Sequence, residues 1–208
     1  MKKYIVEFIG TFFLLFVIGL CVIEPGGAGA MAPLAIGTIL MVMVYAGGHI
    51  SGVHYNPAVT LGVWIRGKCD AKDVFPYMIA QVLGGAAASL LVLKIKTNSI
   101  ITAAMPDTLN ALIAELIFTF ALVYVVLSVA TSKKTAGNSF YGLAIGFTLM
   151  TAAYSIGNIS GCAINPAVAI GLTVMGLSKL SNLWIFFVAN FAGGALAAGV
   201  FKVLNPEE

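Results

Sequence analysis

Residues 51–59 read Ser-Gly-Val-His-Tyr-Asn-Pro-Ala-Val, and residues 160–168 read Ser-Gly-Cys-Ala-Ile-Asn-Pro-Ala-Val. The shared tripeptides, Asn56-Pro57-Ala58 and Asn165-Pro166-Ala167, each lie inside a charge-free run, one over Pro25–Ile65 and the other over Thr135–Ser178. A membrane-spanning helix needs only about 20 apolar residues, roughly half of either run, so each run is expected to cross once and then re-enter part of the way. Asn-Pro within hydrocarbon is tolerated only where the backbone is buried in protein or lines a water-filled cavity. The two stretches therefore predict a pore.

The composition is that of an integral membrane protein. The chain of 208 residues is 60% hydrophobic and 9% charged, with a mean hydropathy of +1.02, whereas a soluble domain carries about 25% charged residues. A net charge of +3 gives no reason to expect a nucleic-acid partner. The three cysteines have no metal-binding or redox spacing, and disulfides are not expected. No nucleophile–base pair or phosphate-binding loop is recognisable, so we expect neither an enzyme nor a metal or cofactor site.

Hydropathy predicts six membrane spans, with both termini on one side. The side with the termini would carry eight Lys and Arg residues and the other side three, so the positive-inside rule places the termini in the cytoplasm. We expect a multi-pass protein of the cell membrane. The six spans are Tyr4–Ile23, Pro33–Ile50, Val74–Leu93, Leu109–Ala130, Phe140–Gly157 and Leu183–Leu204.

The two halves of the chain repeat each other. The shift that places Asn56 on Asn165 superimposes the two motif stretches, and it also places Gly62 on Gly171 and Gly84-Gly85 on Gly193-Gly194. Each half contains three spans, so the second half enters the membrane in the opposite orientation, as an inverted 3+3 repeat. We therefore expect one transmembrane channel domain over residues 1–208, with repeats of about 1–97 and 109–208.

The repeated motif predicts two short helices that re-enter the membrane. Asparagine is a favoured N-cap and proline suits the first helical turn, so Asn56 and Asn165 should each begin a half-helix. The inverted repeat directs both N-termini to the midplane, where their partial positive charges oppose a cation. The side-chain amides of both asparagines can donate hydrogen bonds to a neutral solute. The fold class is thus an all-α membrane protein with six transmembrane helices and two re-entrant half-helices.

These motifs, together with the opening Glu7-Phe8-Ile9-Gly10-Thr11-Phe12, resemble the aquaporin, or major intrinsic protein, family along nearly the entire chain. The resemblance implies a narrow pore in each protomer, a homotetramer in membrane lipid, and Glu7 and Glu115 as acceptors that support the half-helix loops. It also places a selectivity filter at Ile36, Ala153, Cys162 and Val168. Family members usually carry arginine at the position of Val168, so this filter is expected to be apolar and wide.

Several interpretations stay open. An arginine-free filter is compatible with water, urea, ammonia, hydrogen peroxide or undissociated metalloid acids. Glu7 and Glu115 could instead be coupling groups of an inverted-repeat secondary transporter, since carboxylates within membrane spans are usually functional. The chain could also be a structural membrane protein that does not conduct. His54 either lines the cytoplasmic vestibule, as a pH-sensitive gate, or is a hydrogen-bonded scaffold residue.

Overall fold

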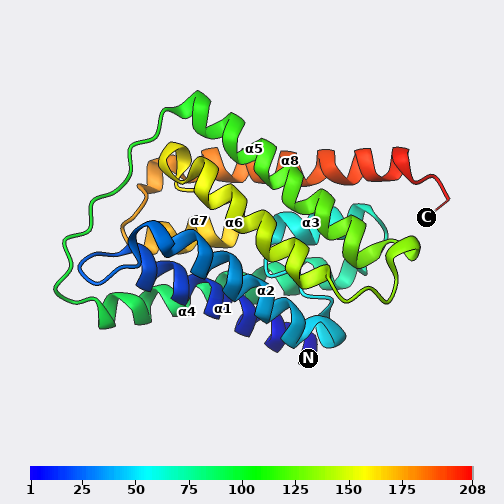
Figure 1. The fold of residues 1–208 in the computed structure, drawn as a ribbon, viewed down its shortest axis with the longest axis horizontal. Helices are drawn as coiled ribbons and strands as arrows, with labels where there is room; N and C mark the ends of the chain where they lie inside the picture. Colours follow the sequence, from blue (N-terminus) through cyan, green and yellow to red (C-terminus); the bar gives the residue numbers. More distant parts are fainter. Residues whose placement is uncertain (208) are drawn as a thin grey trace.

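A computed structural model describes residues 1–207, and within them the chain is almost entirely helical. Six helices are long and apolar enough to cross a membrane. They run along the long axis of the molecule, and both termini lie toward the same end, on the right of Figure 1. The long helices are α1 (Lys2–Val22), α2 (Ala32–Ser51), α4 (Ala71–Ile95), α5 (Thr108–Val126), α6 (Tyr141–Ser160) and α8 (Leu183–Leu204).

Two short helices complete the bundle: α3 (Pro57–Ile65) and α7 (Pro166–Val174). Each has nine residues, about 14 Å of helix and less than half of a bilayer. Figure 1 shows α7 in the half of the bundle away from the termini and α3 in the half that contains them. The expected pair of half-helices entering from opposite ends is therefore present.

The predicted spans agree with the helices to within a few residues, with one difference in kind. The span expected over Leu109–Ala130 is an α-helix only as far as Val126, and Leu127–Thr131 forms a π-helical turn. In this turn the hydroxyls of Ser128 and Thr131 donate to carbonyls four residues earlier. Hydropathy cannot distinguish an α-turn from a π-turn, because the two differ in their backbone hydrogen bonds and not in composition.

Glycines set the distances between the long helices. A Cβ added at Gly84 of α4 would lie 2.3 Å from the carbonyl oxygen of Phe8, and one at Gly193 of α8 would lie 2.5 Å from that of Leu116. Where α2 crosses α6, Gly37 and Gly146 face each other in the same way. Small residues let membrane helices approach closely enough for dense packing. The repeated glycines at 37 and 146 and at 84 and 193 are therefore helix contacts.

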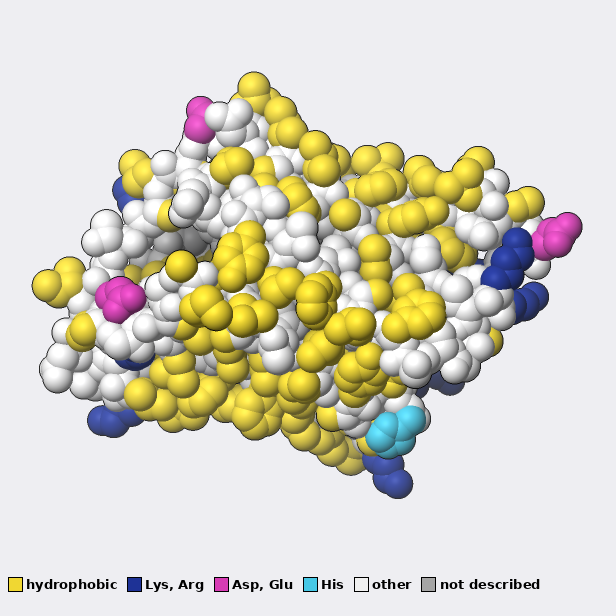
Figure 2. Space-filling model, in the orientation of Figure 1, with side chains coloured by type: hydrophobic (Ala, Val, Ile, Leu, Met, Phe, Trp, Pro, Cys, Tyr) yellow, Lys and Arg dark blue, Asp and Glu magenta, His cyan; other side chains and the backbone are white. Residues whose placement is uncertain are grey.

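The surface separates into an apolar middle and charged ends. On the face in view in Figure 2, hydrophobic side chains cover the central part of the bundle, and Lys, Arg, Asp and Glu side chains gather at its two ends. Large apolar residues of the outer helices, such as Phe75, Leu90, Ile117 and Val188, are more than half exposed. This is the arrangement that a lipid bilayer requires of an integral membrane protein.

Candidate functional site

The two half-helices begin next to each other in the interior. The side-chain oxygen of Asn56 accepts a hydrogen bond from the backbone N–H of Ala58 at 2.8 Å, and that of Asn165 accepts from the N–H of Ala167 at 2.9 Å. Each asparagine is thus the N-cap of its helix, with proline in the first turn, where a missing N–H does no harm. Because the cap uses the oxygen, each side-chain NH2 group points away from its own helix.

Each NH2 group binds the loop that leads to the opposite half-helix. Nδ2 of Asn56 donates to the carbonyl oxygen of Ile164 at 2.9 Å, and Nδ2 of Asn165 donates to that of Tyr55 at 2.9 Å. An amide NH2 carries two hydrogens, so this exchange leaves one on each asparagine for another acceptor. Sequence analysis had assigned both amides to a solute. In the structure, one hydrogen of each links the two halves instead.

Two buried carboxylates hold the loops before the half-helices. Glu7 accepts from the hydroxyl of Ser51 and from the backbone N–H groups of His54 and Tyr55, at 2.6 to 2.9 Å. Glu115 accepts in the same way from Ser160, Ala163 and Ile164, at 2.6 to 2.9 Å. Both carboxylates are fully buried. Backbone N–H groups left without an acceptor in the interior would cost about 1–3 kcal/mol each, so each glutamate fixes the path of one loop.

A side-chain amide from a neighbouring helix also supports each carboxylate. Sequence analysis missed both of these amides. Nε2 of Gln81 donates to Glu7 at 2.8 Å. With the amide of Asn190 oriented so that its NH2 group faces Glu115, the distance to that carboxylate is 3.1 Å. Gln81 and Asn190 occupy equivalent positions of the internal repeat, so applying the repeat offset to polar residues within spans would have found the pair.

The loops have an unusual backbone that presents carbonyl groups to the interior. Val53, Tyr55, Cys162 and Ile164 have φ values between 38° and 51°, a region that residues other than glycine rarely adopt. Such strain costs about 1–3 kcal/mol per residue, and the hydrogen bonds to the glutamates offset it. Since these bonds turn successive N–H groups toward Glu7 or Glu115, the carbonyl groups of the same planar peptides face the opposite way.

Of the two roles that the sequence left open for His54, the contacts of its side chain fit the hydrogen-bonded scaffold. Its side chain is buried, it borders the central cavity described below, and its Nδ1 lies 3.1 Å from Oγ1 of Thr60. That hydroxyl donates to the carbonyl of Asn56 and accepts from Gln81, so its remaining lone pair accepts from Nδ1–H. In the neutral ring, Nε2 is then an acceptor. His54 is a hydrogen-bonded scaffold residue that borders the cavity.

One cavity of about 770 Å³ passes the meeting point of the half-helices. Both capping asparagines and all four predicted filter residues, Ile36, Ala153, Cys162 and Val168, are among its lining residues. Of the other motif residues, Pro57, Ala58, Pro166 and Ala167 are buried behind the wall. There the carbonyl of Ala58 packs on Gly194 and that of Ala167 on Gly85. The alanines therefore serve helix packing, and the asparagines face the cavity.

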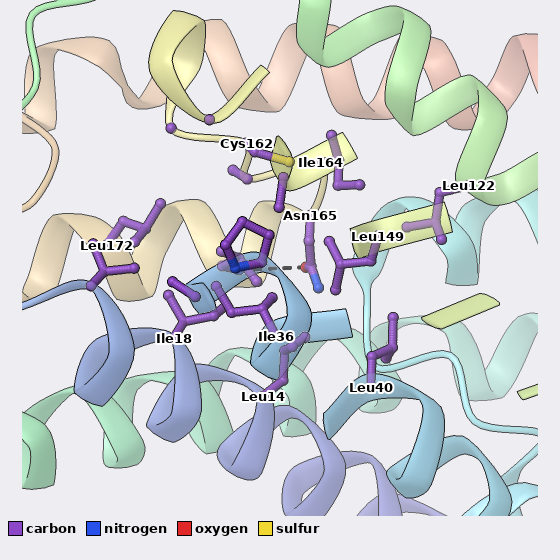
Figure 3. Close-up of a pocket in the computed structure, with 18 of the residues that line it drawn as sticks. Leu14, Ile18, Ile36, Leu40, Leu122, Leu149, Cys162, Ile164, Asn165 and Leu172 are labelled. Carbon is purple, nitrogen blue, oxygen red and sulfur yellow. Dashed lines mark hydrogen bonds between the residues drawn. The ribbon is translucent and has the colours of Figure 1, made fainter. Parts of the chain in front are cut away.

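Much of the lining is an apolar wall, of which sequence analysis predicted only the filter residues Ile36 and Ala153. Figure 3 shows leucine and isoleucine side chains of α1, α2 and α6 gathered around Asn165 and the thiol of Cys162. These wall residues recur at every fourth position of a helix, and the internal repeat relates most of them in pairs. The residues are Leu14, Ile18, Val22, Ile36, Leu40, Val44, Leu122, Val126, Ile145, Leu149 and Ala153. Sequence alone shows the periodicity but not which face of each helix turns to the cavity.

Comparison with known proteins agrees with this architecture. The sequence model of the family described as "Major intrinsic protein" matches residues 1–201. The chain belongs to this family. Its relatives include a glycerol uptake facilitator protein-like 6 of Lactiplantibacillus plantarum, 36% identical over 100% of both chains. An aquaporin Z of Rhodopseudomonas palustris is 35% identical over 99% of this chain and 94% of that protein.

A solved structure supports the fold independently. The X-ray structure of the aquaglyceroporin from Plasmodium falciparum matches 99% of this chain and 97% of its own, with a TM-score of 0.82 and 24% identity. As a member of the major intrinsic protein family, the chain is an integral membrane protein and a passive channel for water or small solutes. The family consists of channels rather than enzymes.

Proposed function

We propose that the cavity is a pore for water and small uncharged solutes such as urea, ammonia, hydrogen peroxide and undissociated metalloid acids. The observation that carries the proposal is the position of Asn56 and Asn165. Both border the same cavity, each with one amide hydrogen left after the cross-links, opposite an apolar wall. A neutral molecule with an acceptor atom can bind these hydrogens in passing, while the wall offers nothing that would hold it.

The half-helices oppose cations in this proposal. Each N-terminus carries roughly half of a positive elementary charge, and both ends meet at the asparagines. At an effective dielectric constant near 20, a unit cation about 5 Å from both ends is repelled by about 3 kcal/mol. Loss of hydration water in the narrow pore adds several kcal/mol. Ions are thus opposed by the backbone rather than by a charged side chain.

We propose Ile36, Ala153, Cys162 and Val168 as the selectivity filter, with a chemistry unlike that of the usual family member. Val168 has no charge to repel ions and no donor to bind hydroxyl groups, whereas arginine would supply both. Such a ring favours solutes that need few hydrogen bonds while they pass. Strict selection of polyols is not expected from it.

The contacts of the glutamates speak against a carrier. A secondary transporter would use Glu7 or Glu115 to bind a coupling ion, but the hydrogen bonds of both carboxylates are made to the half-helix loops. Neither residue borders the cavity. These contacts fit a supporting role for both glutamates. Because the major intrinsic protein family consists of channels, a purely structural, non-conducting protein is the weaker alternative.

The assembly and orientation are also proposals. We propose that residues 1–208 form one channel domain built from repeats of about 1–97 and 109–208, that four copies form a homotetramer, and that both termini are cytoplasmic in the cell membrane. The exposed apolar side chains of the outer helices would contact neighbouring copies and lipid. Cross-linking in membranes would test the homotetramer, and protease accessibility of tagged termini would test the orientation.

Stopped-flow light scattering on proteoliposomes tests the function directly. Vesicles with the protein should shrink or swell faster than empty vesicles when challenged with water gradients and with the uncharged solutes named above. Val168→Arg should reduce the number of solutes that pass, because the new side chain fills and charges the filter. Equal rates in filled and empty vesicles would refute the proposal. An unchanged solute panel in the variant would show that position 168 does not set selectivity.

A further inference from the structure

The cavity wall contains a second apolar ring, and we propose that this ring, rather than the filter, sets the largest solute that the channel passes. The inference rests on the proposed pore function and assigns its size limit to residues other than the four filter positions. We call the filter the outer ring, because it lies toward the end of the bundle opposite the termini. The second ring, nearer the termini, is the inner ring: Val44, Val53, Val59 and Ile145.

The inverted repeat defines the inner ring. Positions related by the shift that places Asn56 on Asn165 occupy equivalent places in the two halves, so each outer-ring residue has a counterpart on the other side of the asparagines. Along α2, Ile36 and Val44 are two helical turns apart, which separates the rings by about 12 Å. All members of both rings border the cavity, and the pairs are Ile36 with Ile145, Val44 with Ala153, Val53 with Cys162, and Val59 with Val168.

The two rings differ in the volume of their side chains. Two of the four pairs are matched, since each ring has one isoleucine and one valine at the equivalent positions. In the other two pairs the inner ring has the branched residues Val44 and Val53, where the outer ring has Ala153 and the unbranched Cys162. With an arginine at position 168, the side chains of the outer ring would fill more of the cross-section than those of the inner ring. Because this chain has valine there, the inner ring fills more of the cross-section.

Solvent access to the rings agrees with their volumes. In the inner ring, Val44 is 1% exposed and Ile145 is 3% exposed. In the outer ring, Ile36 is 8% exposed, Cys162 is 9% exposed and Ala153 is partly exposed. Water-sized molecules therefore reach the outer ring more easily.

The extent of the cavity gives a further indication. At the end away from the termini, the lining includes the mouth residues Gly157, Asn158 and Gly161. Their counterparts near the termini, residues 48, 49 and 52, are absent from the lining among the described residues. The cavity is thus open beyond the outer ring and ends at the inner one. The outer ring behaves as part of a wide vestibule, and a solute meets its narrowest passage after the asparagines.

A matched pair of substitutions tests the proposal. Ile145→Val and Ile36→Val remove the same methylene from equivalent places in the inner and outer rings, and Ile113→Val makes this change on the exposed face of α5. The readout is the ratio of glycerol to water permeability in proteoliposomes, measured by stopped-flow light scattering. We expect the larger rise with Ile145→Val. Val44→Ala removes two carbons and should raise the ratio by at least about tenfold, because one methylene alone gives about tenfold discrimination in an apolar site.

The outcomes separate the two proposals. If vesicles with the wild-type protein are no more permeable than empty ones, the pore function is refuted, and the role of the inner ring is refuted with it. If the wild type conducts but Ile36→Val raises the glycerol-to-water ratio as much as Ile145→Val, or more, the pore function stands. The proposal that the inner ring sets the largest solute is then refuted. Should Val44→Ala fail to fold, as judged by gel filtration, the milder isoleucine pair decides the question.

Discussion

Replacing Asn165 by aspartate should turn the channel into a cation leak. The variant keeps an oxygen to cap α7 through the N–H of Ala167, which now lies 2.9 Å from the asparagine oxygen. It exchanges the NH2 group, which donates to Tyr55, for a second oxygen. The change therefore places a negative charge at the meeting point of the half-helices while the helix itself stays capped.

The magnitude follows from the charges at that point. The two helix ends together amount to about one positive elementary charge, which repels a cation about 5 Å away by about 3 kcal/mol at a dielectric constant near 20. A carboxylate at the same distance cancels this repulsion. Since about 1.4 kcal/mol corresponds to a factor of ten, the cation permeability should rise about 100-fold. Loss of the bond to Tyr55 should lower the stability by about 1–3 kcal/mol, which a folded protein tolerates.

Potassium efflux from loaded proteoliposomes measures this effect. The vesicles carry a potassium gradient with a protonophore to compensate charge, and an ion-selective electrode follows the release at pH 8, where a carboxyl group of ordinary pKa is ionised. Asn158→Asp is the matched control, because Asn158 is exposed and borders the same cavity at its mouth. Salt screens a charge there, so its leak should be much smaller. An Asn165→Asp variant that conducts water but releases no more potassium than the wild type would refute the electrostatic argument.

Three further predictions concern packing, the loops and the filter. Gly193→Ala should destabilise the protein in a thermal unfolding assay by about 1–2 kcal/mol, because the new methyl group meets the backbone of Leu116. Gly199→Ala, on the same helix with no atom within 4 Å, should be neutral or slightly stabilising, and equal effects of both changes would contradict the packing argument. Glu115→Gln should lower both thermal stability and water permeability, since a buried loop N–H loses its acceptor at a cost of about 1–3 kcal/mol. A variant that stays stable and loses only concentrative solute uptake would favour a carrier. A mercurial should block solute flux in the wild type but not in Cys162→Ser, and inhibition that persists in the variant would place the reactive thiol outside the filter.

Much of the architecture could be predicted from the sequence, because hydropathy and repetition act over many residues. The span expected over Leu183–Leu204 coincides with α8, and the others differ by a few residues at their ends. The half-helices could be placed because asparagine and proline have strong positional preferences at helix starts. The π-turn at Leu127–Thr131 could not be predicted, since it depends on local hydrogen bonds that hydropathy does not register.

The site was only partly predictable, because contacts between distant segments decide it. The resemblance to the family implied the filter positions, but the sequence could not show that the amide of Asn56 would bind the carbonyl of Ile164, in the other half of the chain. Nor could it show that Tyr55 would insert its ring where Gly10 and Gly47 leave room for it. Each of these contacts depends on how two helices are rotated about their axes, and a single sequence does not contain that information.

The sequence by itself determined that this chain spans the membrane six times, that its halves are inverted copies, and that two capped half-helices meet in the middle. These properties follow from apolar length, repetition and local backbone preference, which each segment carries independently of its neighbours. The tertiary structure decided which face of each long helix lines the cavity and how far the cavity extends. Both depend on the relative rotation and distance of packed helices. The difference between Val44 and Ala153, which looks trivial in the sequence, has consequences only because the fold sets the two residues in opposite halves of one passage.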